Sequence, residues 1–137
     1  MIGAITSKEH KRYFGWIGTF LLLLIIPIKI IRFSDSSIFY LLIDNGPSFL
    51  GTSGLFFLFL SSKHKYFNHK IYQLALFTLI ISISIELIQL IPRPGILARV
   101  IYTFDTRDLI VSVIGLVMSL IFTIYFIKKS EKIKNRV

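Results

Sequence analysis

Four long apolar stretches run through this chain, and short polar or charged segments separate them. The stretches cover residues 13–31, 47–62, 71–91 and 106–127. An α-helix rises 1.5 Å per residue, so about 20 apolar residues cross the ~30 Å hydrocarbon layer of a bilayer. The pattern predicts an all-α, polytopic membrane protein with four transmembrane helices in one domain over 13–127. Polar tails are expected at 1–12 and 128–137.

The second stretch is short for a membrane span. Asn45-Gly46-Pro47 predicts a helix start at Pro47, because proline suits the first turn of a helix. The sixteen residues of the stretch rise roughly 24 Å, so the helix either extends toward Lys63 or thins the bilayer locally. Gly51 and Gly54 predict a close approach to a neighbouring helix.

Two further apolar pieces, residues 38–43 and 96–102, are too short to cross a bilayer. The first either lies along the outer interface or lengthens a neighbouring helix, and the pattern leaves both interpretations open. Pro92, Pro94 and Gly95 precede the second piece and are expected to end the third span.

Lysine and arginine are distributed unevenly between the two ends of the predicted spans. The end with both termini and the loop 63–70 carries eleven of them, and the other end carries five. Those five are Lys29, Arg32, Arg93, Arg99 and Arg107. Cytoplasmic segments are enriched in these residues, so both termini are predicted to be cytoplasmic. Five acidic residues lie toward the outer end, so the whole net charge of +9 falls on the cytoplasmic side.

Composition supports a membrane protein and narrows its chemistry. The chain is 54% hydrophobic and 17% charged, whereas soluble domains carry about 25% charged residues. It contains no cysteine, which excludes a disulfide framework, a thiol nucleophile and a lipoprotein attachment site. Because the positive charge lies at the cytoplasmic face, the expected partner is membrane lipid rather than nucleic acid.

Polar and small residues recur at intervals of four, three and four in the third and fourth stretches, which places them on one face of each helix. They are Ser82, Glu86, Gln89 and Arg93 in the third stretch and Asp108, Ser112, Gly115 and Ser119 in the fourth. Two such faces in an antiparallel hairpin are expected to meet. Glu86 is expected about 8 Å below the outer end of its helix, and Gly115 with Ser119 is expected to serve packing.

Charged side chains within a membrane are costly, so they need partners or a function. In one interpretation, Glu86, Asp105 and Asp108 form a polar pocket that opens to the outer leaflet and faces nearby arginines. In the other, the same groups form a structural ion-pair network that holds the hairpin together. The sequence leaves both open.

Other chemistry has little support. Three carboxylates suit a hard cation, but no histidine or cysteine lies on the same side, which argues against a zinc site. The chain has no G-x-S-x-G motif, P-loop or G-x-G-x-x-G motif, so an enzyme is not favoured, no catalytic residue is assigned and no cofactor is expected.

Glu86-Leu87-Ile88-Gln89 forms an E-x-x-Q motif, and Phe104-Asp105-Thr106-Arg107-Asp108 forms an F-D-x-x-D motif. In both motifs the hairpin resembles the VanZ-like family of small bacterial membrane proteins. Gly115 matches the glycine that follows, and the resemblance covers residues 38–127.

The sequence departs from the family pattern at four positions. Tyr102 stands where arginine is expected, and Arg99, one turn away, is expected to replace that arginine. Ser112 stands for an asparagine, and Asn45 and Ser48 stand for a lysine and a histidine. These departures fall on positions that would carry a specific activity, so the resemblance implies the family more strongly than the activity.

The resemblance implies a multi-pass protein of the bacterial cytoplasmic membrane, in a family named after a member associated with resistance to a lipoglycopeptide antibiotic. The expected ligand is a lipid headgroup, a cell-wall lipid intermediate or an amphiphilic, glycopeptide-type antibiotic. The expected ligand-binding residues are Glu86, Gln89, Arg99, Asp105, Asp108 and Ser112. The alternatives are a structural or partner-binding subunit and, less favoured, a small transporter or an intramembrane hydrolase.

Overall fold

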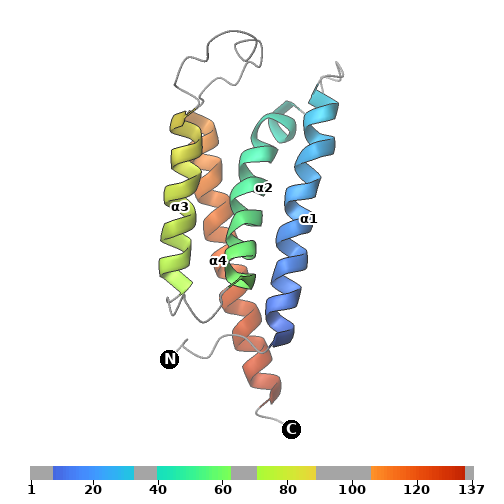
Figure 1. Cartoon of the computed structure of the whole chain (residues 1–137), viewed down its shortest axis with the longest axis vertical. Coiled ribbons are helices and arrows are strands. Elements are labelled where there is room, and N and C mark those ends of the chain that lie inside the picture. The colour runs from blue at the N-terminus through green and yellow to red at the C-terminus, as the bar shows by residue number, and fades with distance from the viewer. Residues whose placement is uncertain (1–7, 33–39, 63–70, 89–105, 135–137) are drawn as a thin grey trace.

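The structure, a computed structural model, describes residues 8–32, 40–62, 71–88 and 106–134, and these residues form four α-helices. The helices are α1 (Lys8–Arg32), α2 (Tyr40–Ser61), α3 (Ile71–Ile88) and α4 (Thr106–Lys134). They run alternately up and down, so the start of α1 and the end of α4 lie together at the lower end of the bundle in Figure 1. The all-α fold class is confirmed.

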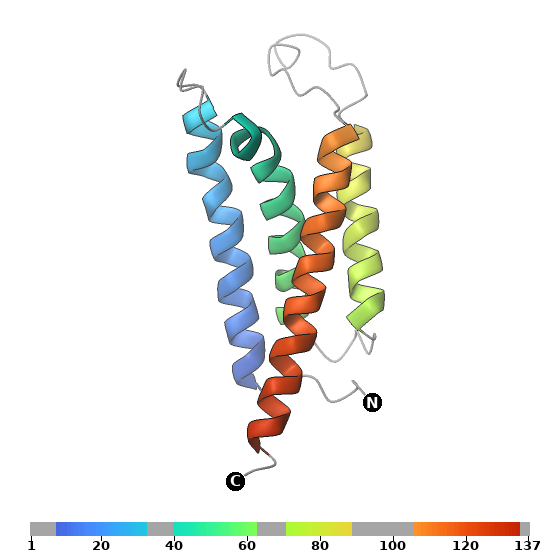
Figure 2. The ribbon, with the colours of Figure 1, turned by 180° about the vertical axis from the view of Figure 1, so that it is seen from behind.

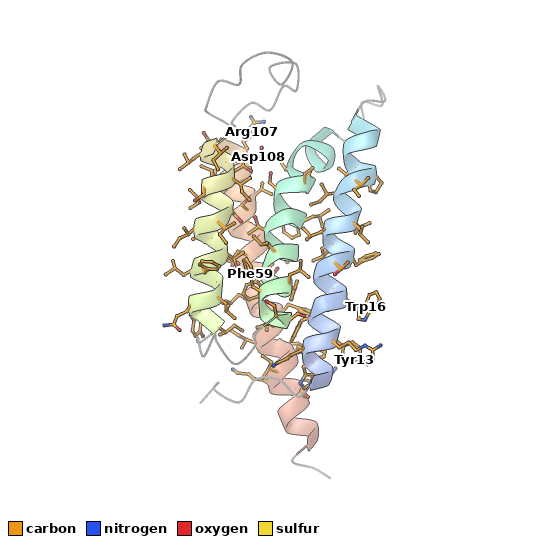
Figure 3. The ribbon with its side chains drawn as sticks, viewed as in Figure 1. Tyr13, Trp16, Phe59, Arg107 and Asp108 are labelled. Atoms are coloured by element: carbon orange, nitrogen blue, oxygen red, sulfur yellow. The ribbon has the colours of Figure 1, made fainter. Side chains whose placement is uncertain are left out.

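Three of the helices are long and apolar enough to cross a membrane. The spans are His10–Ile28 in α1, Ile71–Ile88 in α3 and Thr106–Ser130 in α4. Their outer faces carry exposed large apolar side chains, such as Ile80 and Ile121. Tyr13 and Trp16 point away from the bundle near the lower end of α1 (Figure 3). A surface of this kind suits hydrocarbon, with aromatic residues near its edge, so the chain is built as a multi-pass membrane protein.

α2 does not reach the hydropathy of a membrane span, and it lies at the centre of the bundle. It packs against α1, α3 and α4, whereas α1 and α3 do not approach each other within the described ranges. From behind, α2 is seen between α1 and α4 (Figure 2). None of its residues from Asn45 to Ser61 is exposed. Because protein packs around α2, Thr52, Ser53 and Gly54 at its middle are buried.

The start of α2 differs from the prediction. The helix begins at Tyr40, so the predicted start at Pro47 is wrong, and residues 40–43 lengthen α2. Pro47 lies inside the helix, where it removes one backbone hydrogen bond. The first turns of α2 are bent relative to the rest (Figure 1). Neighbouring helices can satisfy the freed backbone group, which is why membrane bundles tolerate such prolines.

Two other helix limits also differ from the predicted spans. α1 already begins at Lys8, and α4 continues to Lys134 through most of the tail predicted at 128–137. Lysine and glutamate favour helix, so the charged ends extend the helices beyond the apolar spans. α3 begins at Ile71 as predicted, whereas residues 89–91 and the piece 96–102 lie outside the described residues.

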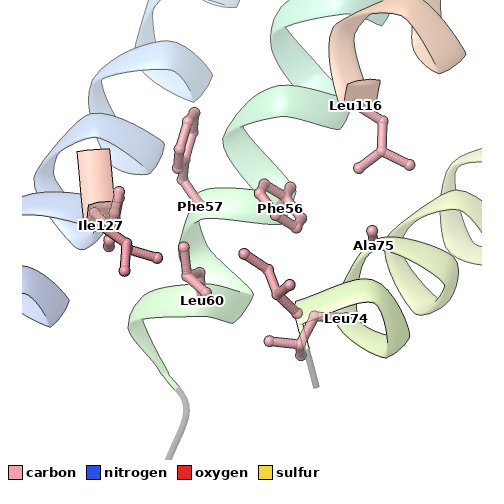
Figure 4. Close-up of a cluster of buried hydrophobic side chains, with 9 residues drawn as sticks. Phe56, Phe57, Leu60, Leu74, Ala75, Leu116 and Ile127 are labelled. Atoms are coloured by element: carbon pink, nitrogen blue, oxygen red, sulfur yellow. The ribbon is translucent and has the colours of Figure 1, made fainter. Parts of the chain in front are cut away.

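Aromatic side chains fill the lower half of the bundle. Phe14 of α1 stacks on Phe57 of α2, with ring centroids 5.8 Å apart. Phe14 also meets Phe126 of α4 edge-on at 5.7 Å. α2 contributes the rings of Phe56 and Phe57 to this group, and Leu60 packs beside them around its lower turns (Figure 4). We call this group the aromatic cluster. It closes the lower end around α2.

α1 and α2 come close together because each has a glycine at the contact. A Cβ atom on Gly18 would lie 2.8 Å from the carbonyl oxygen of Gly54 and 2.9 Å from the backbone nitrogen of Leu58. The close approach predicted for Gly54 is therefore confirmed. At Gly51 an added Cβ atom would make an ordinary contact, 3.7 Å from Cδ1 of Ile25.

Gly18→Ala is expected to destabilise the protein by about 1–3 kcal/mol, because the added methyl group meets backbone atoms that cannot turn aside. Gly51→Ala is the matched control, since its methyl group finds room and alanine favours helix by up to about 1 kcal/mol. Thermal unfolding of both variants in the same detergent, followed by circular dichroism, measures the difference. Equal melting temperatures would contradict the close approach.

Candidate functional site

Buried polar side chains line the faces on which α2, α3 and α4 meet, and we call them the polar seam. Each is less than a tenth exposed. A buried polar group costs free energy unless it is hydrogen-bonded, so the partners of these side chains decide what the seam can do. The members are Thr52, Ser53, Thr78, Ser82, Glu86, Ser112, Ser119 and Thr123.

Three hydrogen bonds of the seam join α2 to α3 and α4. The two polar faces of α3 and α4 were expected to meet each other, but each of them also bonds to α2, which packs against both helices. Side-chain hydrogen bonds between membrane helices are modest in energy and fix how the helices pack. The hydroxyl groups of α2 and α4 donate these bonds: Thr52 to Ser82 Oγ at 3.1 Å, Ser53 to the Gly115 carbonyl oxygen at 3.2 Å, and Ser112 to the Ser48 carbonyl oxygen at 3.4 Å.

The lower members of the seam have structural partners. Thr78, Ser119 and Thr123 each donate to the carbonyl oxygen four residues earlier in their own helix, at 2.8 Å. A Cβ atom on Gly115 would lie 2.9 Å from the carbonyl oxygen of Phe49. The predicted packing role of Gly115 is therefore confirmed, although its neighbour is α2. These residues need no ligand.

Glu86 differs from the rest of the seam in how its two carboxyl oxygens are partnered. Its side chain is only 7% exposed. The hydroxyl of Ser48 hydrogen-bonds its carboxyl group, and Asp108 lies close enough to interact with it electrostatically. The Oε2 atom has no hydrogen-bond partner among the residues that the structure describes. Glu86, Ser48 and Asp108 come from three different helices and together form the candidate site.

The candidate site lies just below the upper end of the bundle. Asp108 is near the start of α4, beside the end of α3 (Figure 3). Ser48 and Asp108 are half-buried, and Arg107 at the rim is exposed. The site therefore reaches the surface through Ser48 and Asp108, with Glu86 behind them.

Half of the predicted ligand-binding residues fall within the described chain. Glu86, Asp108 and Ser112 lie in the region where α2, α3 and α4 meet, and Ser112 bonds to the backbone of Ser48. The others, Gln89, Arg99 and Asp105, lie outside the described residues, and so does Arg93.

The contribution of α2 was missing from the predicted site. Ser48 and Thr52 are four residues apart, the same spacing that marked the polar faces of α3 and α4. The predicted helix start at Pro47 placed Ser48 at the end of a short span. Because α2 begins at Tyr40, Ser48 lies inside the helix, one turn above Thr52.

A separate polar contact joins α1 and α4 at the lower end. His10 Nε2 and Ser130 Oγ are 3.0 Å apart, and the ring of His10 meets Phe126 edge-on. Phe126 and Ile127 lie between Ser130 and the seam residue Thr123 along α4. The aromatic cluster therefore separates this contact from the polar seam.

Within the described residues, no group of three or more histidine, aspartate or glutamate residues is placed to hold a metal ion. Comparison of the chain with models of known families, with curated proteins and with solved structures finds no match. The VanZ-like resemblance thus stays a prediction from the motif residues.

The Thr52–Ser82 hydrogen bond predicts an energetic coupling between α2 and α3. A double-mutant cycle of Thr52→Val and Ser82→Ala is expected to give about 0.6 kcal/mol, the average for such bonds between membrane helices. The cycle is measured by unfolding in mixed micelles. Thr52→Val with Ser84→Ala is the control, because the exposed Ser84 bonds to its own helix at Ile80. A coupling as large in the control would contradict the assignment.

Proposed function

We propose that the chain crosses the bacterial cytoplasmic membrane four times, with both termini in the cytoplasm. α2 supplies the fourth crossing, since its 22 residues rise about 33 Å, enough for the hydrocarbon layer. Among the described residues, the lower end carries more Lys and Arg than the upper end, which favours a cytoplasmic lower end. These residues are Lys8, Lys11, Arg12, Lys128, Lys129, Lys132 and Lys134 below, and Lys29, Arg32 and Arg107 above.

Single cysteines test this topology, because the chain has none of its own. Arg107→Cys and Lys132→Cys place a thiol at exposed positions near opposite ends of α4. With a membrane-impermeant maleimide on intact cells, we expect Arg107→Cys to be labelled and Lys132→Cys to be labelled only after permeabilisation. The opposite pattern would place the candidate site on the cytoplasmic side.

In this membrane protein, the candidate site binds the polar head of an amphiphile that enters from the outer leaflet. The head belongs to a lipid, a cell-wall lipid intermediate or an amphiphilic antibiotic. The observation that carries this proposal is the enclosed Oε2 atom of Glu86, which has no hydrogen-bond partner in the described part of the chain. An ionisable group inside a membrane bundle is costly and commonly marks a binding or transport site.

The distribution of polar groups along the bundle favours binding over transport. The carboxyl groups of Glu86 and Asp108 lie near the end of α3 and the start of α4, at the upper end. The lower half holds the aromatic cluster, and the hydroxyls of Thr78 and Thr123 there bond to their own helices. A transport pathway needs polar groups or water through its whole length. A bound head would thus stay near the outer surface, while its apolar part remains in the surrounding lipid.

The motif residues add to this proposal. Glu86 and Asp108 are the described carboxylates of the E-x-x-Q and F-D-x-x-D motifs, and they belong to the same site. The resemblance to the VanZ-like family implies a link to an amphiphilic antibiotic, which has the chemistry of a polar head on an apolar tail.

A structural or partner-binding subunit is the second candidate. The hydrogen bonds of α2 and the glycine contact with α1 favour it, because they hold the bundle together without a ligand. In that case Glu86→Leu would preserve function and raise stability, since an unpartnered polar group would be replaced by an apolar one.

Native mass spectrometry of protein purified from the bacterial membrane tests binding. The wild type is expected to retain one discrete amphiphile, and Glu86→Gln is expected to retain at least about tenfold less. A hydrogen bond to a charged group contributes about 1.5–3 kcal/mol, which corresponds to a factor of ten or more. Ser84→Ala, on the outer face of the same helix, serves as the control. Equal retention in all three proteins would exclude the Glu86 site.

A further inference from the structure

The candidate site is rich in acceptors. Glu86 and Asp108 contribute carboxylate oxygens, and the hydroxyl of Ser48 already donates to Glu86. Asp108, which also has an interaction of its own, acts electrostatically on Glu86. Two carboxylates in a poorly solvated place repel each other, and a cation beside Glu86 reduces this repulsion. An anionic head would instead be repelled by Glu86.

We infer that the site binds a primary ammonium group carried by an amphiphile. This inference rests on the amphiphile-binding function proposed above and names the chemistry of the head. An ammonium group has three N–H donors and no acceptor. Glu86 Oε2 would accept one of these hydrogen bonds. Ser48 and Asp108, which both interact with Glu86 from other helices, would supply the acceptors beside it.

The side chains around Glu86 suit an ammonium group better than a metal ion. Calcium takes six to eight oxygen ligands and magnesium takes six. The described residues provide no group of three or more acidic or histidine side chains for a metal. An ammonium group needs three acceptors, and its carbon chain can leave the site past the half-buried Ser48 and Asp108.

Oε2 of Glu86 is the atom that an ammonium group would satisfy. It is enclosed, and no other described group bonds to it. A charge-assisted hydrogen bond at this oxygen is about twice as strong as a neutral one. Glu86→Gln removes the charge and keeps the shape of the side chain. It should therefore reduce the affinity for the ligand more than it reduces the stability of the protein.

Four single-chain probes separate the possible head groups. They are dodecylamine, dodecyltrimethylammonium, dodecanol and dodecyl phosphate, each titrated against the full-length protein in detergent while its melting temperature is followed. Dodecylamine is charged at neutral pH, as a lysine side chain is. It is expected to stabilise the wild type saturably, with an apparent affinity at least about tenfold above that for dodecyltrimethylammonium, which has no N–H donor.

Two variants test whether the stabilisation by dodecylamine depends on the candidate site. Glu86→Gln is expected to weaken dodecylamine at least about tenfold, and Asp108→Asn is expected to weaken it in the same direction. Ser84→Ala should leave it unchanged, because Ser84 faces outward from the same helix. If Glu86→Gln does not fold, Asp108→Asn alone decides, since Asp108 is half-buried and tolerates an amide more readily.

The outcomes separate this inference from the proposed function. If dodecyl phosphate or dodecanol binds saturably through Glu86 and dodecylamine does not bind, the site still binds amphiphiles. The inference that it recognises an ammonium group would then be wrong. Equal affinity for dodecylamine and dodecyltrimethylammonium would overturn the three-donor arrangement. If no probe binds through Glu86 and no native amphiphile is retained, the proposed function fails as well.

Nanodiscs identify the source of the ammonium group once it binds. If phosphatidylethanolamine, but not phosphatidylcholine, competes with dodecylamine, the headgroup of the membrane lipid is the occupant. If neither lipid competes, the occupant is an amine on a non-lipid amphiphile, such as an antibiotic. Both results support an ammonium site and assign it to one source.

Discussion

The need to keep polar groups away from hydrocarbon determines how this bundle is built. Inside a bilayer no water satisfies a hydroxyl or a carboxyl group, so each must find a partner in the protein. α2 is the helix richest in small and hydroxyl residues, and it packs among the three helices whose outer faces are apolar. Thr52, Ser53 and Gly54 are all buried there. Among the described residues, the exposed large apolar side chains belong to α1, α3 and α4.

The same arrangement separates two regions along the bundle. In the lower half, Phe14, Phe57 and Phe126 pack as rings and leave little polar surface. In the upper half, hydroxyl groups hold the helices together, and the carboxyl group of Glu86 is placed where those hydroxyls do not fully satisfy it. The hydrogen bonds that hold the helices together and the enclosed Oε2 atom of Glu86 therefore lie in one interface. Under the proposed function, the buried acid is kept for a ligand while the neighbouring hydroxyls bond to the protein itself.

Local signals and tertiary packing disagree at the start of α2. Asn45-Gly46-Pro47 has the residues of a helix start, but the helix already runs from Tyr40. A proline in the sequence indicates only that one backbone hydrogen bond is lost locally. It gives no information on the packing of α1, α3 and α4 against α2, which stabilises a bent helix. The family resemblance had named Ser48 only as a departure. It was not placed on a polar face with Thr52, since the register of such a face is recognised only when the helix around it is known.

The amino-acid sequence alone determined the all-α class and three of the spans, through the length of its hydrophobic stretches. The spacing of polar residues also placed Glu86 on the same helix face as Ser82. These depend on a period of 3.6 residues and on the length needed to cross hydrocarbon, both of which are local. Tertiary structure decided that α2 is central, that Gly18 and Gly54 meet, and that Ser48 and Asp108 reach Glu86 from two other helices. Contacts between residues as distant as Ser48 and Ser112 depend on how whole helices pack, and no local pattern in a single sequence records that choice.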